Sequence, residues 1–132
     1  MSTTKINVFL IDDSEEDNFY VEDIISENER IGEVTSFLDS EKALQHIIDL
    51  DERNQELPHL ILIDVRMPDL DGFEWIDEID QHFREFKPVL MMLTSSRHRK
   101  DVESFDKQFL AKELLSKPLE QAVFDELLKK YF

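Results

Sequence analysis

The residues best suited to chemistry are carboxylates at the ends of two short apolar runs. Asp12 and Asp13 end the first run, and Asp64 ends the run Leu60–Ile63. Three carboxylates held close together cannot all stay ionised without a compensating charge, because like charges disfavour one another. The chain has no cysteine, and no histidine stands beside these acids. An all-oxygen site for a hard cation such as Mg²⁺ is therefore predicted.

Two further side chains complete the predicted chemistry. Thr94, which follows the apolar run 89–93, offers a hydroxyl that can donate to an oxyanion. Lys117, which precedes Pro118, offers a flexible positive charge suited to a phosphoryl group. We therefore predict that Asp64 is a nucleophile that attacks phosphorus, with the cation and the lysine balancing the charge on the phosphoryl oxygens.

Each of these residues also has an ordinary structural interpretation, which stays open when it is taken alone. Asp64 is equally suited to starting a turn. Thr94 is suited to capping a following helix, and Lys117 to an exposed surface position. The basic run Arg97–Lys100 is interpreted as a solvated face, with contact to a partner protein as the alternative.

An alternation of strands and helices positions these residues. Strands are predicted at 5–11, 33–38, 60–63, 89–93 and 113–116. Helices are predicted at about 15–28, 41–50, 73–83, 97–109 and 120–132. This pattern indicates an α/β fold: a five-stranded parallel sheet of order 2-1-3-4-5, flavodoxin-like, with helices on both faces. Because parallel strands place their carboxyl ends along one edge, we expect the acids, the threonine and the lysine to share that edge.

Local signals set the expected boundaries of these elements. Ser14 and Ser40 are the expected N-caps of the first two helices. Gly32 is expected to separate the first helix from the second strand, and residues 51–56 are expected to form a loop. Phe109 is assigned to the apolar face of the fourth helix, which is the least regular of the five.

Composition limits the classes of partner. The 132 residues contain 31 acidic and 15 basic side chains, for a formal net charge of −16. A field of this sign repels phosphate backbones and anionic lipids, so neither nucleic acid nor a membrane is expected as a partner. The absence of cysteine, of a signal-like segment and of a long apolar run predicts a cytoplasmic location.

Four motifs resemble those of a response-regulator receiver domain of two-component signalling. They occur in the expected order after the first, third, fourth and fifth strands. They are Asp12-Asp13, the run from Asp64 to Gly72, Thr94-Ser95 and Lys117-Pro118. The resemblance covers essentially the whole chain, so a single receiver domain over residues 1–132, without an output domain, is expected.

The resemblance implies a role for each acid. Asp64 would accept a phosphoryl group from a phosphohistidine of a histidine kinase or histidine phosphotransfer protein. Asp13 and Asp64 would supply carboxylates to Mg²⁺, Asp12 would act mainly through a bound water, and the backbone carbonyl of Arg66 would complete the protein ligands. Such a domain promotes its own phosphorylation and dephosphorylation but is not a conventional enzyme.

The switching residues are also implied by the resemblance, with two departures from the family pattern. Thr94 would be the switch hydroxyl, and Lys117 would pair with the phosphoryl group across a cis peptide bond to Pro118. Leu114 stands where the family usually has an aromatic ring, which puts the usual coupling of hydroxyl and ring in doubt. Arg66 adds a long cation two residues after the acceptor, and we expect it to alter the lifetime of the phosphorylated protein.

The output is expected to be a change of surface. Phosphorylation would alter the surface around the fourth helix, the fifth strand and the last helix, and this surface would select a downstream protein target. The protein would be a monomer or a phosphorylation-dependent dimer.

Four other classes of protein or site share part of this pattern. A calcium-binding EF-hand around Asp69–Gly72 would begin with Met67 and Pro68, which lacks the first carboxylate. A haloacid-dehalogenase-type phosphatase requires a second acid where Arg66 stands. A flavodoxin requires a phosphate-binding loop, but the acidic segment Asp12–Asp17 would repel phosphate. The remaining alternative is a receiver fold that acts as a phosphorylation-independent docking module.

Overall fold

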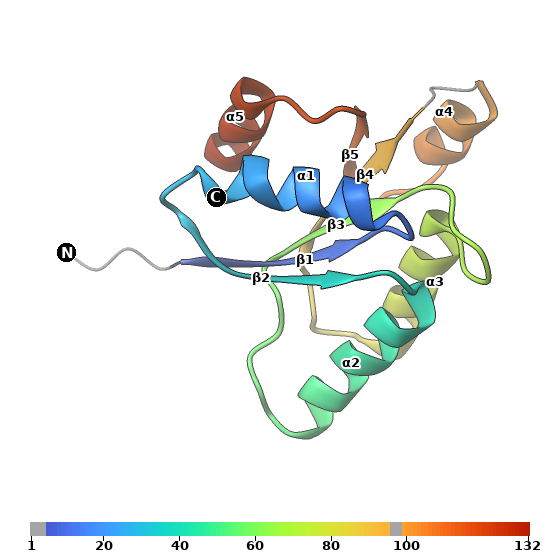
Figure 1. Cartoon of the computed structure of the whole chain (residues 1–132). Coiled ribbons are helices and arrows are strands. Elements are labelled where there is room, and N and C mark those ends of the chain that lie inside the picture. The colour runs from blue at the N-terminus through green and yellow to red at the C-terminus, as the bar shows by residue number, and fades with distance from the viewer. Residues whose placement is uncertain (1–4, 96–98) are drawn as a thin grey trace.

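Strands and helices alternate along the chain in the computed structural model, which describes residues 5–95 and 99–132 (Figure 1). The strands are β1 (Ile6–Ile11), β2 (Ile31–Phe37), β3 (Leu60–Asp64), β4 (Val89–Thr94) and β5 (Ala111–Ser116). The helices are α1 (Glu15–Ser26), α2 (Ser40–Glu52), α3 (Gly72–His82), α4 (Arg99–Asp106) and α5 (Gln121–Tyr131). Neighbouring strands are parallel in the order β2-β1-β3-β4-β5, which confirms the predicted fold.

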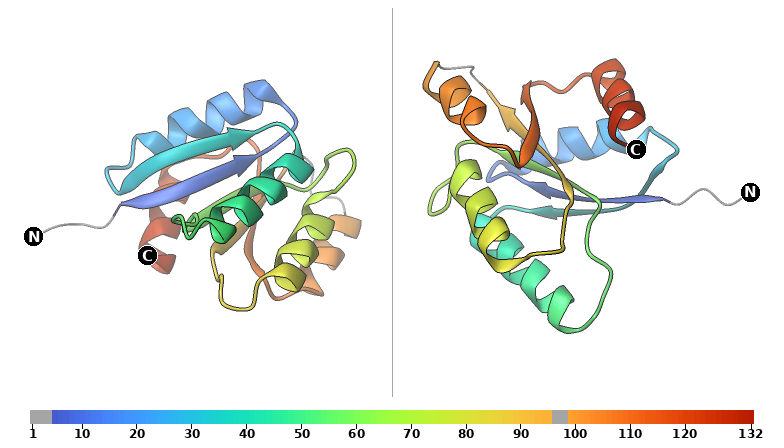
Figure 2. Two further views of the ribbon diagram at one scale, coloured as in Figure 1. Left: turned by 90° about the horizontal axis from the view of Figure 1, so that it is seen from below. Right: turned by 180° about the vertical axis from the view of Figure 1, so that it is seen from behind.

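The sheet is buried on both faces. Successive side chains of a strand point to opposite sides, so Leu60 and Leu62 of β3 pack in one layer and Ile61 and Ile63 in the other. The first layer contains buried residues of α1 and α5, and the second contains those of α2 and α3. Figures 1 and 2 show the same two pairs of helices on opposite sides of the sheet. This double burial explains why β3 is a continuous apolar run.

The strand register brings the predicted site residues to one edge. Ile11 pairs with Ile63, so the residues that follow β1 lie beside the end of β3. Asp64 pairs with Leu93, and Thr94 pairs with Ser116 one position further along. The carboxyl ends of four adjacent strands therefore meet at the same rim.

The start of α2 differs from the prediction. Asp39 is the N-cap, and its side chain accepts hydrogen bonds from two N–H groups of the first turn. Ser40 is the first helical residue, and its hydroxyl instead donates to the carbonyl of Leu70 at 2.9 Å. Both residue types cap helices well, so the tertiary contact to the loop after β3 decides between them. The helix also continues to Glu52, which shortens the loop predicted at 51–56.

Gly32 lies inside β2, where the prediction had placed a boundary between helix and strand. A Cβ atom at this position would lie 2.7 Å from Oδ1 of Asn7 on β1. The same oxygen accepts a hydrogen bond from the N–H of Glu33 at 2.9 Å. The glycine therefore makes room for a side chain that crosses between two strands.

The segment between β4 and β5 also differs from the prediction. Of the predicted helix, residues 97–98 lie outside the described part of the chain, and α4 ends at Asp106. Phe109 is not on a helical face, because it follows the helix and its surface is 88% exposed. The side chain of Gln108 accepts hydrogen bonds from the N–H groups of residues 110 and 111. This turn lets β5 begin at Ala111, two residues earlier than predicted.

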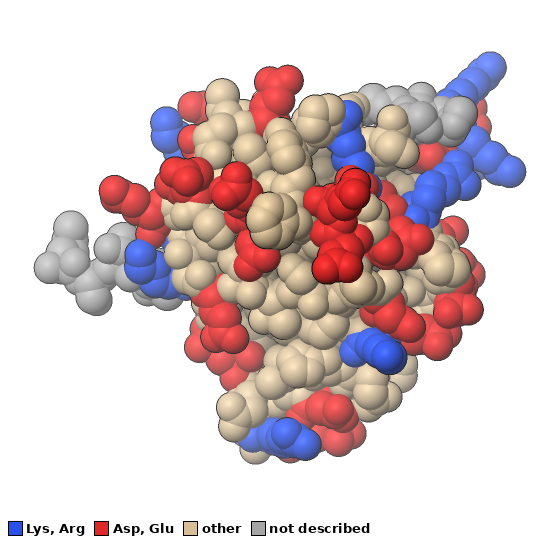
Figure 3. Space-filling model, viewed as in Figure 1, with Lys and Arg blue, Asp and Glu red and all other residues tan. Residues whose placement is uncertain are grey.

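The surface is strongly acidic. Figure 3 shows Asp and Glu side chains spread over one face of the molecule, with Lys and Arg mostly in isolated positions. Within residues 5–95 and 99–132, no helix has the length and apolar character needed to cross a bilayer.

Candidate functional site

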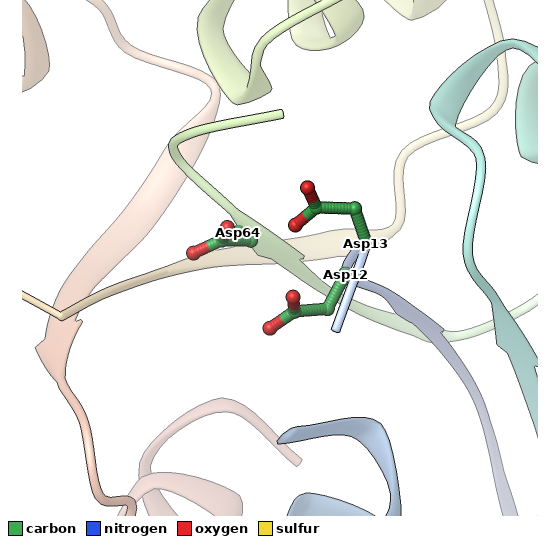
Figure 4. A group of neighbouring side chains, drawn as sticks. All are labelled: Asp12, Asp13 and Asp64. Atoms are coloured by element: carbon green, nitrogen blue, oxygen red, sulfur yellow. The ribbon is translucent and has the colours of Figure 1, made fainter. Parts of the chain in front are cut away.

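Three carboxylates form the centre of the site. Asp12 and Asp13 follow β1 and Asp64 ends β3, and their side chains point to a common side (Figure 4). One oxygen from each residue lies within 4.8 Å of the others. Asp12 and Asp64 are buried, whereas Asp13 is exposed and leaves the group open to solvent. An oxygen-only donor set that is open on one side fits a hard divalent cation such as Mg²⁺.

The turn after β3 holds Asp64 at the rim. The N–H of Val65 donates to the carbonyl of Leu93, and its own carbonyl accepts from the N–H of Gly72, both at 2.9 Å. A Cβ atom at Gly72 would lie only 2.7 Å from the backbone oxygen of Asp64. Glycine at this position therefore allows the start of α3 to pack directly on the backbone of the acid.

Hydrogen bonds tie the start of α1 to Asp12. One carboxylate oxygen of Asp12 accepts from the N–H of Ser14 at 2.9 Å, and Ser14 caps the helix by accepting from the N–H of Asp17. The side-chain amide of Asn18 donates to the backbone oxygens of Asp12 and Phe37. The predicted N-cap at Ser14 is confirmed, and the first turn of α1 is attached to the rim at several points.

Lys117 lies among the carboxylates of the site. Its Nζ atom is 2.6 Å from Oδ2 of Asp12, 2.8 Å from Oδ2 of Asp17 and 3.2 Å from Oδ1 of Asp64. The lysine side chain is only 14% exposed, so water screens these interactions weakly. The ammonium group therefore supplies the positive charge that the three acids require.

The pKa values reflect the competition between burial and charge. Burial raises the pKa of Asp64 to about 6, and the negative charge of Asp12 adds to this increase, whereas Lys117 opposes it. The pKa of Asp12 is also raised by burial, against the hydrogen bond from the lysine. Burial alone would lower the pKa of Lys117, but its hydrogen bonds to Asp12 and Asp17 outweigh that effect and raise it. The pocket thus favours an additional positive charge near its acids.

Thr94 lies on β4, next to β3, and Leu114 lies on β5, the edge strand beyond β4. Thr94 ends β4 and is buried, and its backbone oxygen accepts a hydrogen bond from the N–H of Lys117 at 2.8 Å. The peptide bond between Lys117 and Pro118 is cis, as the resemblance implied. Leu114 on β5 is buried in the layer that contains α2 and α3.

Arg66 pairs with an acid of α4. Its Nη2 atom lies 2.7 Å from Oδ1 of Asp101, and the side chain of the arginine is 62% exposed. Asp101 is buried, and its Oδ2 atom has no hydrogen-bond partner among the residues that the structure describes. The expected effect of Arg66 on the lifetime of the phosphorylated protein therefore stays a prediction, and its partner in the structure is Asp101.

Two residues of this network were missed in the sequence. Asp17 entered the sequence interpretation only as part of the helix cap and of the acidic segment Asp12–Asp17, although a helix that starts directly after a strand places its first turn near the same rim. Asp101 gave no usable signal, because nothing in the charged segment distinguishes it from the exposed Glu103 and Asp106.

Solved structures with the same fold cover nearly all of the chain. A two-component response regulator from Cytophaga hutchinsonii has a TM-score of 0.87 and 29% identity, with 97% of each chain covered. A response regulator receiver protein from Dyadobacter fermentans has a TM-score of 0.82 and 27% identity, with 96% of this chain and 98% of that chain covered. A chemotaxis protein from Vibrio cholerae is 20% identical with a TM-score of 0.77, covering 98% and 100% of the two chains, which shows the shared fold.

The sequence itself carries the family pattern. We found no matching relative among curated proteins. The profile described as "Response regulator receiver domain" matches residues 8–129, a span that includes all four motifs at the rim. The chain therefore belongs to the response regulator receiver domain family.

Proposed function

We propose that the protein is a phosphoacceptor in two-component signal transduction. Asp64 takes a phosphoryl group from a phosphohistidine of a histidine kinase or histidine phosphotransfer protein in a Mg²⁺-dependent step. The observation that carries this proposal is the position of the Lys117 ammonium group, 3.2 Å from the Asp64 carboxylate at the edge of the acidic pocket. A phosphoryl group on Asp64 would lie within reach of that charge.

The residues of the pocket have complementary tasks in this reaction. An oxygen of Asp64 attacks phosphorus, a new P–O bond forms, the P–N bond to the histidine breaks, and its electron pair stays on the departing nitrogen. Lys117 and the hydroxyl of Thr94 orient the oxygens of the transferred group. Mg²⁺, when bound, supplies further positive charge for these oxygens.

The proposed ligands of the cation come from two strand ends. Asp13 and Asp64 supply carboxylates, Asp12 acts mainly through a water molecule, and the backbone carbonyl of Arg66 completes the protein ligands. The close spacing of the three carboxylates and the raised pKa of Asp64 support this assignment. Removal of the cation with a chelator should abolish phosphorylation.

The proposed output is a change in the surface formed by α4, β5 and α5, which then binds a downstream protein. The Arg66–Asp101 ion pair supports this proposal, because it joins the loop after the acceptor directly to α4. We propose a cytoplasmic protein, monomeric or dimeric on phosphorylation, that binds neither nucleic acid nor membranes. Phosphotransfer profiling against the histidine kinases and phosphotransfer domains of the source cell would identify its donor.

Phosphorylation by a small-molecule donor tests the assignment of Asp64. Incubation with acetyl phosphate and Mg²⁺ should add one base-labile phosphoryl group, detected as a mass increase, and Asp64→Asn should remove it. Asp69→Asn is a matched control, because this exposed acid lies in the same loop and should leave the modification intact. An unmodified wild-type protein would instead favour the phosphorylation-independent docking module.

A further inference from the structure

The ammonium group of Lys117 has one partner that is not part of the acid cluster. Asp12 and Asp64 belong to the group of carboxylates that can hold a cation, whereas Asp17 does not. Yet Asp17 approaches the lysine to 2.8 Å, closer than Asp64 does. It lies in the first turn of α1.

A divalent cation and Lys117 compete for the same carboxylates. A cation held by Asp12, Asp13 and Asp64 would repel the ammonium group and reduce the charge available to it from these acids. Asp17 lies outside this group of acids, so its carboxylate remains available to the lysine in that state. We propose that Asp17 is a positioning residue for Lys117, which retains the ammonium group at the rim when a divalent cation occupies the neighbouring acids. This inference rests on the proposed function of the pocket.

The local structure suits Asp17 to this task. Its N–H donates to the Ser14 cap, and the amide of the next residue, Asn18, donates to the backbone oxygen of Asp12. The backbone at position 17 is therefore attached to the strand end that carries the acids. The carboxylate of Asp17 is 45% exposed, whereas its partner, Lys117, is only 14% exposed.

The first test is Mg²⁺ affinity, measured by calorimetry on the whole chain. In Asp17→Asn the lysine has only Asp12 and Asp64 left, so it competes more strongly with the cation, and affinity should fall by about threefold to tenfold. The matched control is Glu15→Gln, which removes one charge from the same helical turn. Among the described residues the lysine pairs with Asp12, Asp17 and Asp64 and not with Glu15. The control variant should change affinity by less than about twofold.

The second test separates positioning from a general effect of charge. The ammonium resonance of Lys117, assigned with Lys117→Arg, should stay ordered in Mg²⁺-loaded wild type and become broadened or averaged in Asp17→Asn. At saturating Mg²⁺, phosphorylation by acetyl phosphate should be about fivefold slower in this variant. Asp17→Glu retains the charge on a longer side chain and should recover at least half of the lost rate.

The proposal is overturned if Asp17→Asn matches Glu15→Gln in Mg²⁺ affinity, or if it binds Mg²⁺ more tightly than wild type. An ordered ammonium resonance in Mg²⁺-loaded Asp17→Asn would overturn it as well. These outcomes are independent of phosphorylation. If wild type binds Mg²⁺ but takes up no phosphoryl group, the proposed function fails while the affinity and resonance measurements still decide the role of Asp17.

Discussion

Arg66 and Asp101 form an ion pair that connects the loop after β3 to α4. The guanidinium Nη2 atom lies 2.7 Å from Oδ1 of the aspartate, which is buried although most of the arginine side chain is exposed. The second carboxylate oxygen, Oδ2, is buried without a hydrogen-bond partner among the described residues. Among the described residues, Arg66 is therefore the charged partner of an acid that is buried in the first turn of α4.

This pair should contribute measurably to stability. In Arg66→Ala the buried carboxylate of Asp101 loses its partner, and the free energy of unfolding should fall by about 1–2 kcal/mol. Arg99→Ala is the matched control, because its ion pair with Glu103 is exposed on both sides and should contribute less than about 0.5 kcal/mol. Urea unfolding of Arg66→Ala, Asp101→Asn and the double variant gives the coupling energy of the pair, and Arg99→Ala is measured alongside them. Equal losses in the two arginine variants would contradict the prediction.

The same pair should affect the lifetime of the phosphorylated protein. Asp101→Asn weakens the attachment of Arg66, which can then cover a phosphoryl group on Asp64 and obstruct the approach of water. In the phosphorylated wild type we expect Arg66 to divide its time between Asp101 and the phosphoryl group, and Arg66→Ala removes this partial cover altogether. We expect dephosphorylation half-lives to change in opposite directions, longer in the first variant and shorter in the second, each by about threefold, or roughly 0.7 kcal/mol in the barrier. The decay of the phosphorylated species, followed by mass, checks this. Unchanged half-lives would show that Arg66 points away from the site in both states.

The raised pKa of Asp64 predicts how stability depends on pH in the absence of metal. With a folded-state pKa of about 6 against an ordinary value of 3.8, the folded protein takes up a proton that the unfolded chain does not. The ionised Asp64 carboxylate therefore lowers the free energy of unfolding above pH 6. This destabilisation decreases as the pH falls from about 6 to about 4.

The matching experiment compares Asp64→Asn with wild type in a chelating buffer. The uncharged variant should be more stable at pH 7.5 by about 1–3 kcal/mol, and the difference should disappear as the pH approaches 4. Urea unfolding at pH 4.5, 6 and 7.5 gives the difference in the free energy of unfolding between Asp64→Asn and wild type at each pH. A variant less stable than wild type at pH 7.5 would contradict the predicted cost of the buried charge.

Gly72 should be intolerant of a side chain. A Cβ atom there would lie 2.6 Å from Cε of Met92 and 2.7 Å from the backbone oxygen of Asp64, so Gly72→Ala should cost about 1–3 kcal/mol and weaken Mg²⁺ binding. The comparison variant is Gly32→Ala on the edge strand β2. Its Cβ would meet the side chains of Asn7 and Lys5, far from the acids, so any loss of stability should leave Mg²⁺ affinity unchanged. Calorimetric unfolding and Mg²⁺ titration separate the two effects.

The fold could be predicted from the sequence because its signals are local. Apolar runs such as Leu60–Ile63, followed by acids or turn residues, indicate strands that are buried on both faces. Once these strands are parallel, Asp12, Asp64 and Thr94 must share an edge, whatever their separation along the chain. The element order and the common rim followed from this argument.

The boundaries that were wrong depend on contacts between distant segments. The choice of Asp39 over Ser40 as the cap of α2 follows from the hydrogen bond of Ser40 to the loop after β3. The place of Gly32 inside β2 follows from the Asn7 side chain that crosses from the neighbouring strand. Neither partner can be identified from the residues next to these positions.

The sequence by itself determined the α/β fold and the types of side chain that meet at its rim, because strand periodicity and strand ends are set by residues a few positions apart. Only the tertiary structure decided that Lys117 is held by Asp17 as well as by Asp12, and that Arg66 pairs with Asp101. The physical reason is that an ion pair depends on the direction and burial of two side chains, and packing sets both only after the helices have docked on the sheet.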